Sequence, residues 1–182
     1  MTSSYLADSE FTEEKILPYR ILSVIVDNKP GVLFRVTNLF RARNFNIESI
    51  TVGTTEQKDI SRMTIAIQSD YKTLDQLVKQ LRKLIDIIEV RVLDTENTVF
   101  RELALIKMKA SDSTSRIEIT HFSNIFRAKI LDVSKDSMIV EITGTPDKID
   151  AFKNIVIPYG IIQIARTGIS ALLRGYNDDN RT

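Results

Sequence analysis

The fold is decided by residues 21–53, which read ILSVIVDNKPGVLFRVTNLFRARNFNIESITVG. The stretch begins with an apolar, β-branched run at residues 21–26, which is typical of a strand. A short polar turn follows, and apolar residues then recur at helical spacing: Val32, Leu33, Val36, Leu39 and Phe40. Residues 46–53 predict a second strand, with Ile50 and Val52 on one face.

The same alternation of periods completes a first unit. Residues 62–68 alternate apolar and polar side chains as a strand does, and residues 54–59 are the hairpin loop before them. A second helical stripe follows: Leu74, Leu77, Val78, Leu81, Leu84 and Ile85. Residues 88–92 close the unit as a strand, so the predicted order is βαββαβ.

The order repeats downstream. The predicted elements are a strand at 101–109, a helix at 114–126, a hairpin of 128–134 with 138–144, a helix after Thr145-Pro146, and a strand at 161–166. The sequence therefore predicts an α+β protein built from two ferredoxin-like βαββαβ units. In each unit, two helices would cover one face of an antiparallel sheet, and the bare second face is a reason to expect partners or self-association.

The predicted organisation has five parts. Residues 1–18 form an N-terminal arm, residues 19–94 the first unit, residues 95–99 a linker, residues 100–175 the second unit, and residues 176–182 a tail. A length of 182 residues suits two such small domains.

Composition excludes several classes of function. The 25 Lys and Arg nearly balance the 24 Asp and Glu, so the chain lacks the basic surface of a nucleic-acid binder. Because there is no cysteine, disulfides and thiolate chemistry are excluded. No apolar run is long enough to span a membrane, and the polar, acidic start is unlike a signal peptide, so we expect a cytoplasmic protein without membrane contact.

No constellation of residues predicts catalysis or metal binding. The one histidine, His121, falls in a predicted helix, and Ser123 two positions later points elsewhere, which favours an ordinary surface histidine. Carboxylates are scattered along the chain, and the six glycines are isolated rather than grouped in a phosphate-binding loop. We therefore predict no catalytic residue and no metal ligand.

One turn has a physical rationale for binding. Asn28-Lys29-Pro30-Gly31 joins the first strand to the first helix, where free amide hydrogens and the helix dipole favour a carboxylate. Gly31 would let a ligand approach the backbone, and the Asn28 amide offers a donor and an acceptor. The alternative is a plain helix start, in which Asn28 caps the helix, Pro30 lies in its first turn and Gly31 is incidental.

Several stretches closely resemble the ACT domain and the remainder of the acetolactate synthase (acetohydroxyacid synthase) small-subunit family. They are NKPGVLFRV (28–36), LFRARNFNIESI (39–50), SRMTI (61–65), QLRKLID (80–86), RELALIK (101–107), GTPDKIDAF (144–152) and ARTG (165–168). The resemblance spans about residues 19–175, and NIES, SRMTI and ARTG in this order are its most specific parts. The chain departs from the usual bacterial pattern in its arm and in Gln163, where an acidic residue is more usual.

The resemblance implies a regulatory subunit without catalytic activity of its own. Its partner would be the large catalytic subunit, which holds thiamine diphosphate, Mg²⁺ and FAD and performs the first common step of branched-chain amino acid biosynthesis. The small subunit would activate that partner and confer feedback inhibition, usually by valine.

The resemblance also implies a place for the effector. ACT domains form a homodimer, and valine would bind at its interface. Residues of one chain would meet Asn46 and Ile47 of the other, and the implied effector-binding set is Asn28, Lys29, Pro30, Gly31, Val32, Leu33, Asn46 and Ile47. From the chain's own folding, Asn46 is expected to open the second strand near the turn.

Two other classes of function stay open. One is a stand-alone amino-acid-sensing ACT module that regulates a different enzyme or transcription, although the near-zero net charge argues against DNA binding. The other is an enzyme in its own right, which the missing catalytic motifs argue against.

Overall fold

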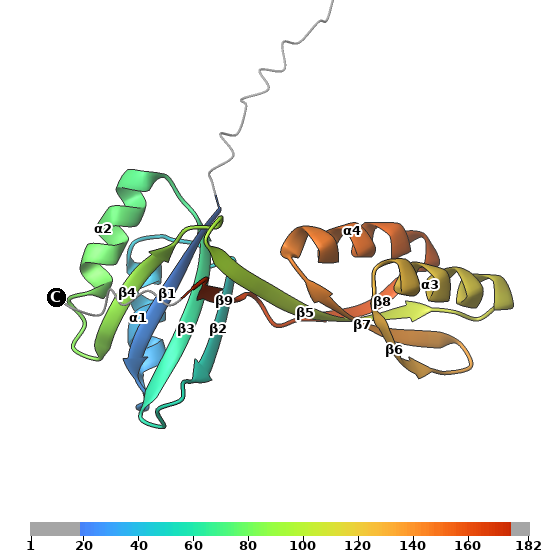
Figure 1. The fold of residues 1–182 in the computed structure, drawn as a ribbon, viewed down its shortest axis with the longest axis horizontal. Coiled ribbons are helices and arrows are strands. Elements are labelled where there is room, and N and C mark those ends of the chain that lie inside the picture. The colour runs from blue at the N-terminus through green and yellow to red at the C-terminus, as the bar shows by residue number, and fades with distance from the viewer. Residues whose placement is uncertain (1–18, 176–182) are drawn as a thin grey trace, which may run out of the picture.

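The computed structural model describes residues 19–175, and the predicted arm and tail lie outside the described residues. Two βαββαβ units follow one another along the long axis of the molecule (Figure 1). The first contains β1 (Tyr19–Asp27), α1 (Val32–Ala42), β2 (Ser49–Thr54), β3 (Ile60–Gln68), α2 (Tyr71–Leu81) and β4 (Ile87–Leu93). The second contains β5 (Thr98–Lys109), α3 (Ser113–Ile125), β6 (Lys129–Val133), β7 (Ser137–Gly144), α4 (Pro146–Val156), a short 3-10 helix (Ile157–Tyr159), β8 (Ile161–Arg166) and β9 (Ser170–Leu173).

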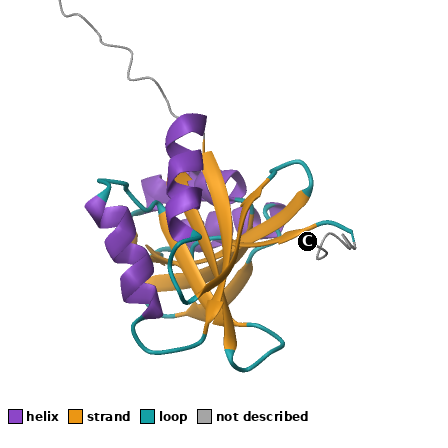
Figure 2. Cartoon of the chain, turned by 90° about the vertical axis from the view of Figure 1, so that its left-hand side faces the viewer, coloured by secondary structure: helices purple, strands orange, loops and turns teal. Residues whose placement is uncertain are grey.

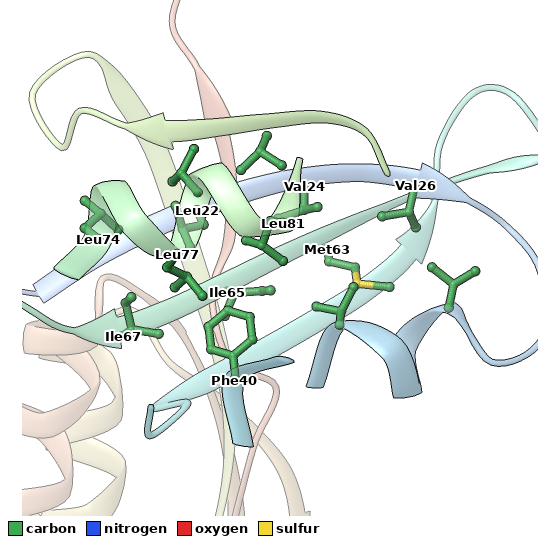
Figure 3. Close-up of a cluster of buried hydrophobic side chains, with 14 residues drawn as sticks. Leu22, Val24, Val26, Phe40, Met63, Ile65, Ile67, Leu74, Leu77 and Leu81 are labelled. Atoms are coloured by element: carbon green, nitrogen blue, oxygen red, sulfur yellow. The ribbon is translucent and has the colours of Figure 1, made fainter. Parts of the chain in front are cut away.

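The first unit is an antiparallel sheet with strand order β2-β3-β1-β4. Helices α1 and α2 lie on one face of it, and their apolar side chains point onto β1 and β3 (Figure 3). Phe40 of α1 and Leu77 and Leu81 of α2 are fully buried there. The helical and alternating apolar patterns of the sequence therefore meet in one core as predicted, except that α2 ends at Leu81 and Ile85 of the predicted stripe is 94% exposed.

The second unit repeats this architecture, with strand order β6-β7-β5-β8. Its core lies between the sheet and helices α3 and α4, and its largest fully buried side chain is Phe152. The helices of the molecule gather on one side of the strands when it is viewed from the end of the first unit (Figure 2). The predicted α+β class with two ferredoxin-like units is confirmed.

Matching caps begin one helix in each unit. The Asp70 carboxylate accepts a hydrogen bond from the Thr73 amide ahead of α2, and Asp112 does the same from Ser115 ahead of α3. Hydrogen bonds from Thr73 lower the pKa of Asp70, and those from Ser115 lower the pKa of Asp112. Both helices therefore begin with a charged cap at the positive end of the dipole.

Strand β5 takes part in two successive pairings. Its first four residues, from Thr98, pair with β9, and the stretch from Glu102 to Lys109 pairs with β7 and β8. The β9 strand was not predicted, because its four residues are too few to set a period. The predicted strand at 101–109 begins three residues earlier, inside the stretch predicted as a linker.

The β5–β9 pair covers part of the second face of the first sheet. Ile169 and Ala171 pack against Ile21, Ala66 and Leu93 in a separate buried cluster. The expectation that this face is bare is therefore wrong for this part of the sheet, because the chain itself returns to cover it.

Truncating Phe152 to alanine should lower the free energy of unfolding of the second unit by about 3–5 kcal/mol, because a fully buried ring is replaced by a cavity. Urea denaturation followed by circular dichroism measures the loss, and hydrogen exchange of β5 and β7 amides assigns it to this unit. Ile117→Ala is the control, since Ile117 is 69% exposed on α3 and its truncation should change stability by less than about 0.5 kcal/mol. Equal losses in the two variants would contradict the assigned core.

Candidate functional site

The turn between β1 and α1 is tied to the hairpin loop between β2 and β3. The backbone N–H of Asn28 donates to the Asp59 carbonyl at 2.7 Å, and the side-chain Nδ2 of Asn28 donates to the Lys58 carbonyl at 3.0 Å. These bonds orient the Asn28 side chain, and they use its donor but leave its oxygen as an acceptor. The interpretation of Asn28 as a helix cap is wrong, because its side chain bonds the hairpin and not the helix.

Gly31, rather than Asn28, occupies the N-cap position of α1. Its φ of 85° lies in the left-handed region, which a side chain disfavours. Pro30 precedes this residue and so lies before the helix, not in its first turn as predicted. The conformation of Gly31 turns the chain sharply into α1, so this glycine is not incidental.

The start of α1 is open to a ligand. Leu33 is 44% exposed and Phe34 is 70% exposed. Among the described residues nothing accepts a hydrogen bond from the amides of Leu33 and Phe34, and the first turn holds no acidic residue. The positive end of the helix dipole is thus uncompensated, which favours an anionic group at this position.

Two cations beside the turn already have carboxylate partners. Lys29 Nζ lies 2.6 Å from Asp27 Oδ2, and hydrogen bonding and charge from Asp27 raise the pKa of Lys29. Arg35 Nε lies 2.6 Å from Oδ2 of Asp86, whose side chain is only 10% exposed. An anion at this site would therefore be held mainly by backbone amides. The fold pairs Arg35 with Asp86 across 51 residues, which periodicity alone did not predict.

Asn46 and Ile47 lie in the loop between α1 and β2. Asn46 Nδ2 donates to Glu48 Oε1 at 2.8 Å, and Ile47 is partly buried against the core. They line an open hollow of about 580 Å³. Its other lining residues are Thr37, Phe40, Arg41, Asn44 and Phe45. Asn44 has a φ of 56°, so this loop leaves the helix through a left-handed residue, and β2 begins only at Ser49.

Within one chain, the turn and this loop lie at opposite ends of the sheet. Strands β1 and β2 both run antiparallel to β3, so they are parallel to one another. The end of β1 pairs with Ile60 and the start of β2 with Ala66, six residues apart along β3. At about 3.3 Å per residue this separation is about 20 Å. The expectation that Asn46 lies near the turn of its own chain is therefore wrong.

The predicted effector residues thus form two groups. Asn28 to Leu33 lie together at the start of α1, where the Val32 side chain is 2% exposed and belongs to the core. Asn46 and Ile47 lie beyond its end. No cluster of three or more potential metal ligands occurs within residues 19–175, and no helix in that range has the length and apolar character of a membrane span.

Comparison with known proteins gives the family. A family model described as the AHAS small subunit-like ACT domain matches residues 22–89, and one described as the small subunit of acetolactate synthase matches residues 101–175. The probable acetolactate synthase small subunit of Archaeoglobus fulgidus is 54% identical over 85% of this chain and 96% of its own length.

Two further relatives agree. The acetolactate synthase small subunit of Mycolicibacterium smegmatis is 50% identical over 87% of this chain and 92% of its own. The crystal structure of the small subunit from Thermotoga maritima superposes with a TM-score of 0.81 at 43% identity, covering 88% of this chain and all of that one.

Replacing Gly31 by alanine should lower the free energy of unfolding by about 1–2 kcal/mol, because a side chain is disfavoured at a φ of 85°. A Cβ there would meet only Arg35 at ordinary contact distance, so the loss would come from the backbone. Urea denaturation measures it. In the control, Gly53→Ala places its methyl group in open space on β2 and should leave stability unchanged or raise it by up to about 1 kcal/mol. An unchanged free energy of unfolding in Gly31→Ala would contradict the requirement for glycine at this position.

Proposed function

Because the chain belongs to the family of acetolactate synthase small subunits, we propose that it activates the large catalytic subunit and inhibits it when a branched-chain amino acid, usually valine, binds. The observation that best supports this proposal is a pair of features at opposite ends of α1. One is the open start of the helix, and the other is the hollow at Asn46 and Ile47. The small subunit regulates and does no covalent chemistry of its own.

A homodimer would bring the two groups together. Strand β2 is an edge strand of its sheet, and exposed apolar side chains lie on it and on α1: Val52, Leu33 and Phe34. A two-fold axis through the middle of this edge would set the two copies of α1 antiparallel. The turn of each chain would then face Asn46 and Ile47 of the other, so one axis completes two pockets.

The polar groups suit an α-amino acid. The amides of Leu33 and Phe34 would receive its carboxylate, since no other group in the described chain accepts from them. The free oxygen of Asn28 would accept from its ammonium group. Ile47 of the second chain would provide an apolar wall for the branched side chain. Val32 would contribute backbone only, because its side chain is buried.

Regulation follows if valine binds two arrangements of the dimer with different affinity. A coupling free energy of about 1–3 kcal/mol would correspond to a difference of about 5–150-fold in valine affinity between the two arrangements. Thiamine diphosphate, Mg²⁺ and FAD belong to the large subunit in this proposal, and the complex would work in the cytoplasm.

Reconstitution with the large subunit should raise acetolactate formation from pyruvate, and valine should then lower it. The measurements are the initial rate of acetolactate formation with and without this chain, at increasing valine concentration. Failure of the large subunit to co-purify or to gain activity would refute the proposal and favour a stand-alone amino-acid sensor. Activation without a response to valine, leucine or isoleucine would refute the feedback part alone.

Asn28→Ala should weaken valine binding about 10–150-fold, because a hydrogen bond to a charged ligand group contributes about 1.5–3 kcal/mol. Isothermal titration calorimetry of the small subunit compares the dissociation constants. Asn154→Ala is the matched control, since Asn154 is an exposed amide on α4 of the other unit and its loss should leave binding unchanged. An unaltered dissociation constant in Asn28→Ala would mean that this residue only fastens the turn to the hairpin.

A further inference from the structure

The start of β2 contacts the second unit directly. Thr51 Oγ1 donates to the Thr167 carbonyl at 3.2 Å. Gly168 follows with a φ of 80°, and a Cβ built on it would lie 3.1 Å from both Ser49 Cβ and Thr51 Oγ1. The backbone of Gly168 therefore packs closely on β2, and a side chain there would have to push Ser49 and Thr51 away by a few tenths of an ångström. Ser49 is only two residues beyond Ile47 of the proposed effector site.

Arg166 and Thr167, which precede Gly168, are hydrogen-bonded to other residues of the second unit. Arg166 forms two hydrogen bonds with Glu102, of 2.6 and 2.7 Å, and a third with Asp150 at 2.8 Å. The Glu102 side chain is only 6% exposed, and these carboxylates raise the pKa of Arg166 despite the opposing effect of burial. Thr167 Oγ1 accepts from the Leu103 amide at 3.2 Å. A displacement of Gly168 would therefore move strands β5 and β8 with it.

An open cavity of about 750 Å³ lies beside this contact. It is lined by both units, and its charged residues are Glu48, Glu102, Asp147, Asp150 and Arg166. Glu48 also accepts the hydrogen bond from Asn46. A ligand that engages the Asn46 amide would compete with Glu48 for it and so alter both the effector loop and the wall of the cavity.

We propose that the contact of Gly168 with Ser49 and Thr51 transmits effector binding from the first unit to the second. This inference rests on the proposed function and adds a route to it. A shift of residues 46–51 on binding is passed through this glycine to residues 165–168, and from there to β5 and β8. Gly168, Ser49 and Thr51 are positioning residues, because none of them is assigned a contact with the effector.

The test uses Gly168→Ala in the full chain reconstituted with the large subunit. Three quantities are measured: the valine dissociation constant by calorimetry, the activation without valine, and the residual activity at saturating valine. The new methyl group separates the two surfaces, so we expect residual activity to rise toward the uninhibited level. Valine affinity of the small subunit should stay within about twofold, because Gly168 is not among the effector-binding residues, and activation should persist.

Gly175→Ala is the matched control. Gly175 also has a positive φ, of 72°, but a Cβ there meets nothing within 4 Å. It therefore carries similar backbone strain without the contact, and its inhibition should match that of the wild type. Adding Ser49→Gly to Gly168→Ala removes two of the three close atoms and should restore part of the inhibition.

The outcomes separate the two proposals. Equal inhibition by valine in Gly168→Ala and Gly175→Ala would overturn the transmission route. A parallel loss of valine affinity, activation and inhibition in Gly168→Ala would also overturn it, because that result indicates a structural role. If Gly168→Ala does not fold, Thr51→Val removes only the hydrogen bond to Thr167, and full inhibition in that variant would overturn the route. A wild-type chain that neither activates nor responds to valine would instead overturn the proposed function.

Discussion

Continuous pairing of strand β5 is the constraint on which the arrangement of the molecule depends. Its twelve residues hydrogen-bond first to β9, which packs on the first sheet, and then to β7 and β8 in the sheet of the second unit. Bending it at the boundary would break ladder bonds whose groups need partners. Together with Ile169 and Ala171 packed on the first sheet, β5 makes the boundary between the units an extended strand rather than a loop.

The direction of the strands then determines what one chain can bind. Because β1 and β2 are parallel, the end of one and the start of the other lie at opposite ends of the sheet. The Gly31 turn presents free amides at one end, and the Asn46 loop presents a hollow at the other. In the proposed function each is one half of an amino-acid site, because a single chain keeps the free amides about 20 Å from the hollow.

The sequence predicted the two units and their helices well, because residues such as Phe40 and Phe152 recur at the helical period on one buried face. Prediction from the sequence failed where contacts between distant residues determine the structure. Asn28 looked like a cap but bonds the hairpin at Lys58, and β9 exists only because β5 supplies a partner. The spatial relation of Asn46 to the turn depends on sheet order, which local periodicity does not encode. The contact of Gly168 with β2 likewise depends on segments far apart in the sequence, since Thr51 and Thr167 are separated by 116 residues.

The separation of the turn and the loop along α1 has a consequence for sensing in a cell. In the proposed dimer no isolated chain holds a whole pocket, so ligand binding and self-association are thermodynamically linked. Valine would strengthen the dimer by the same factor by which dimerisation strengthens valine binding. The half-saturating concentration of valine would then depend on how much of the protein the cell contains, and dilution alone would make the sensor less sensitive.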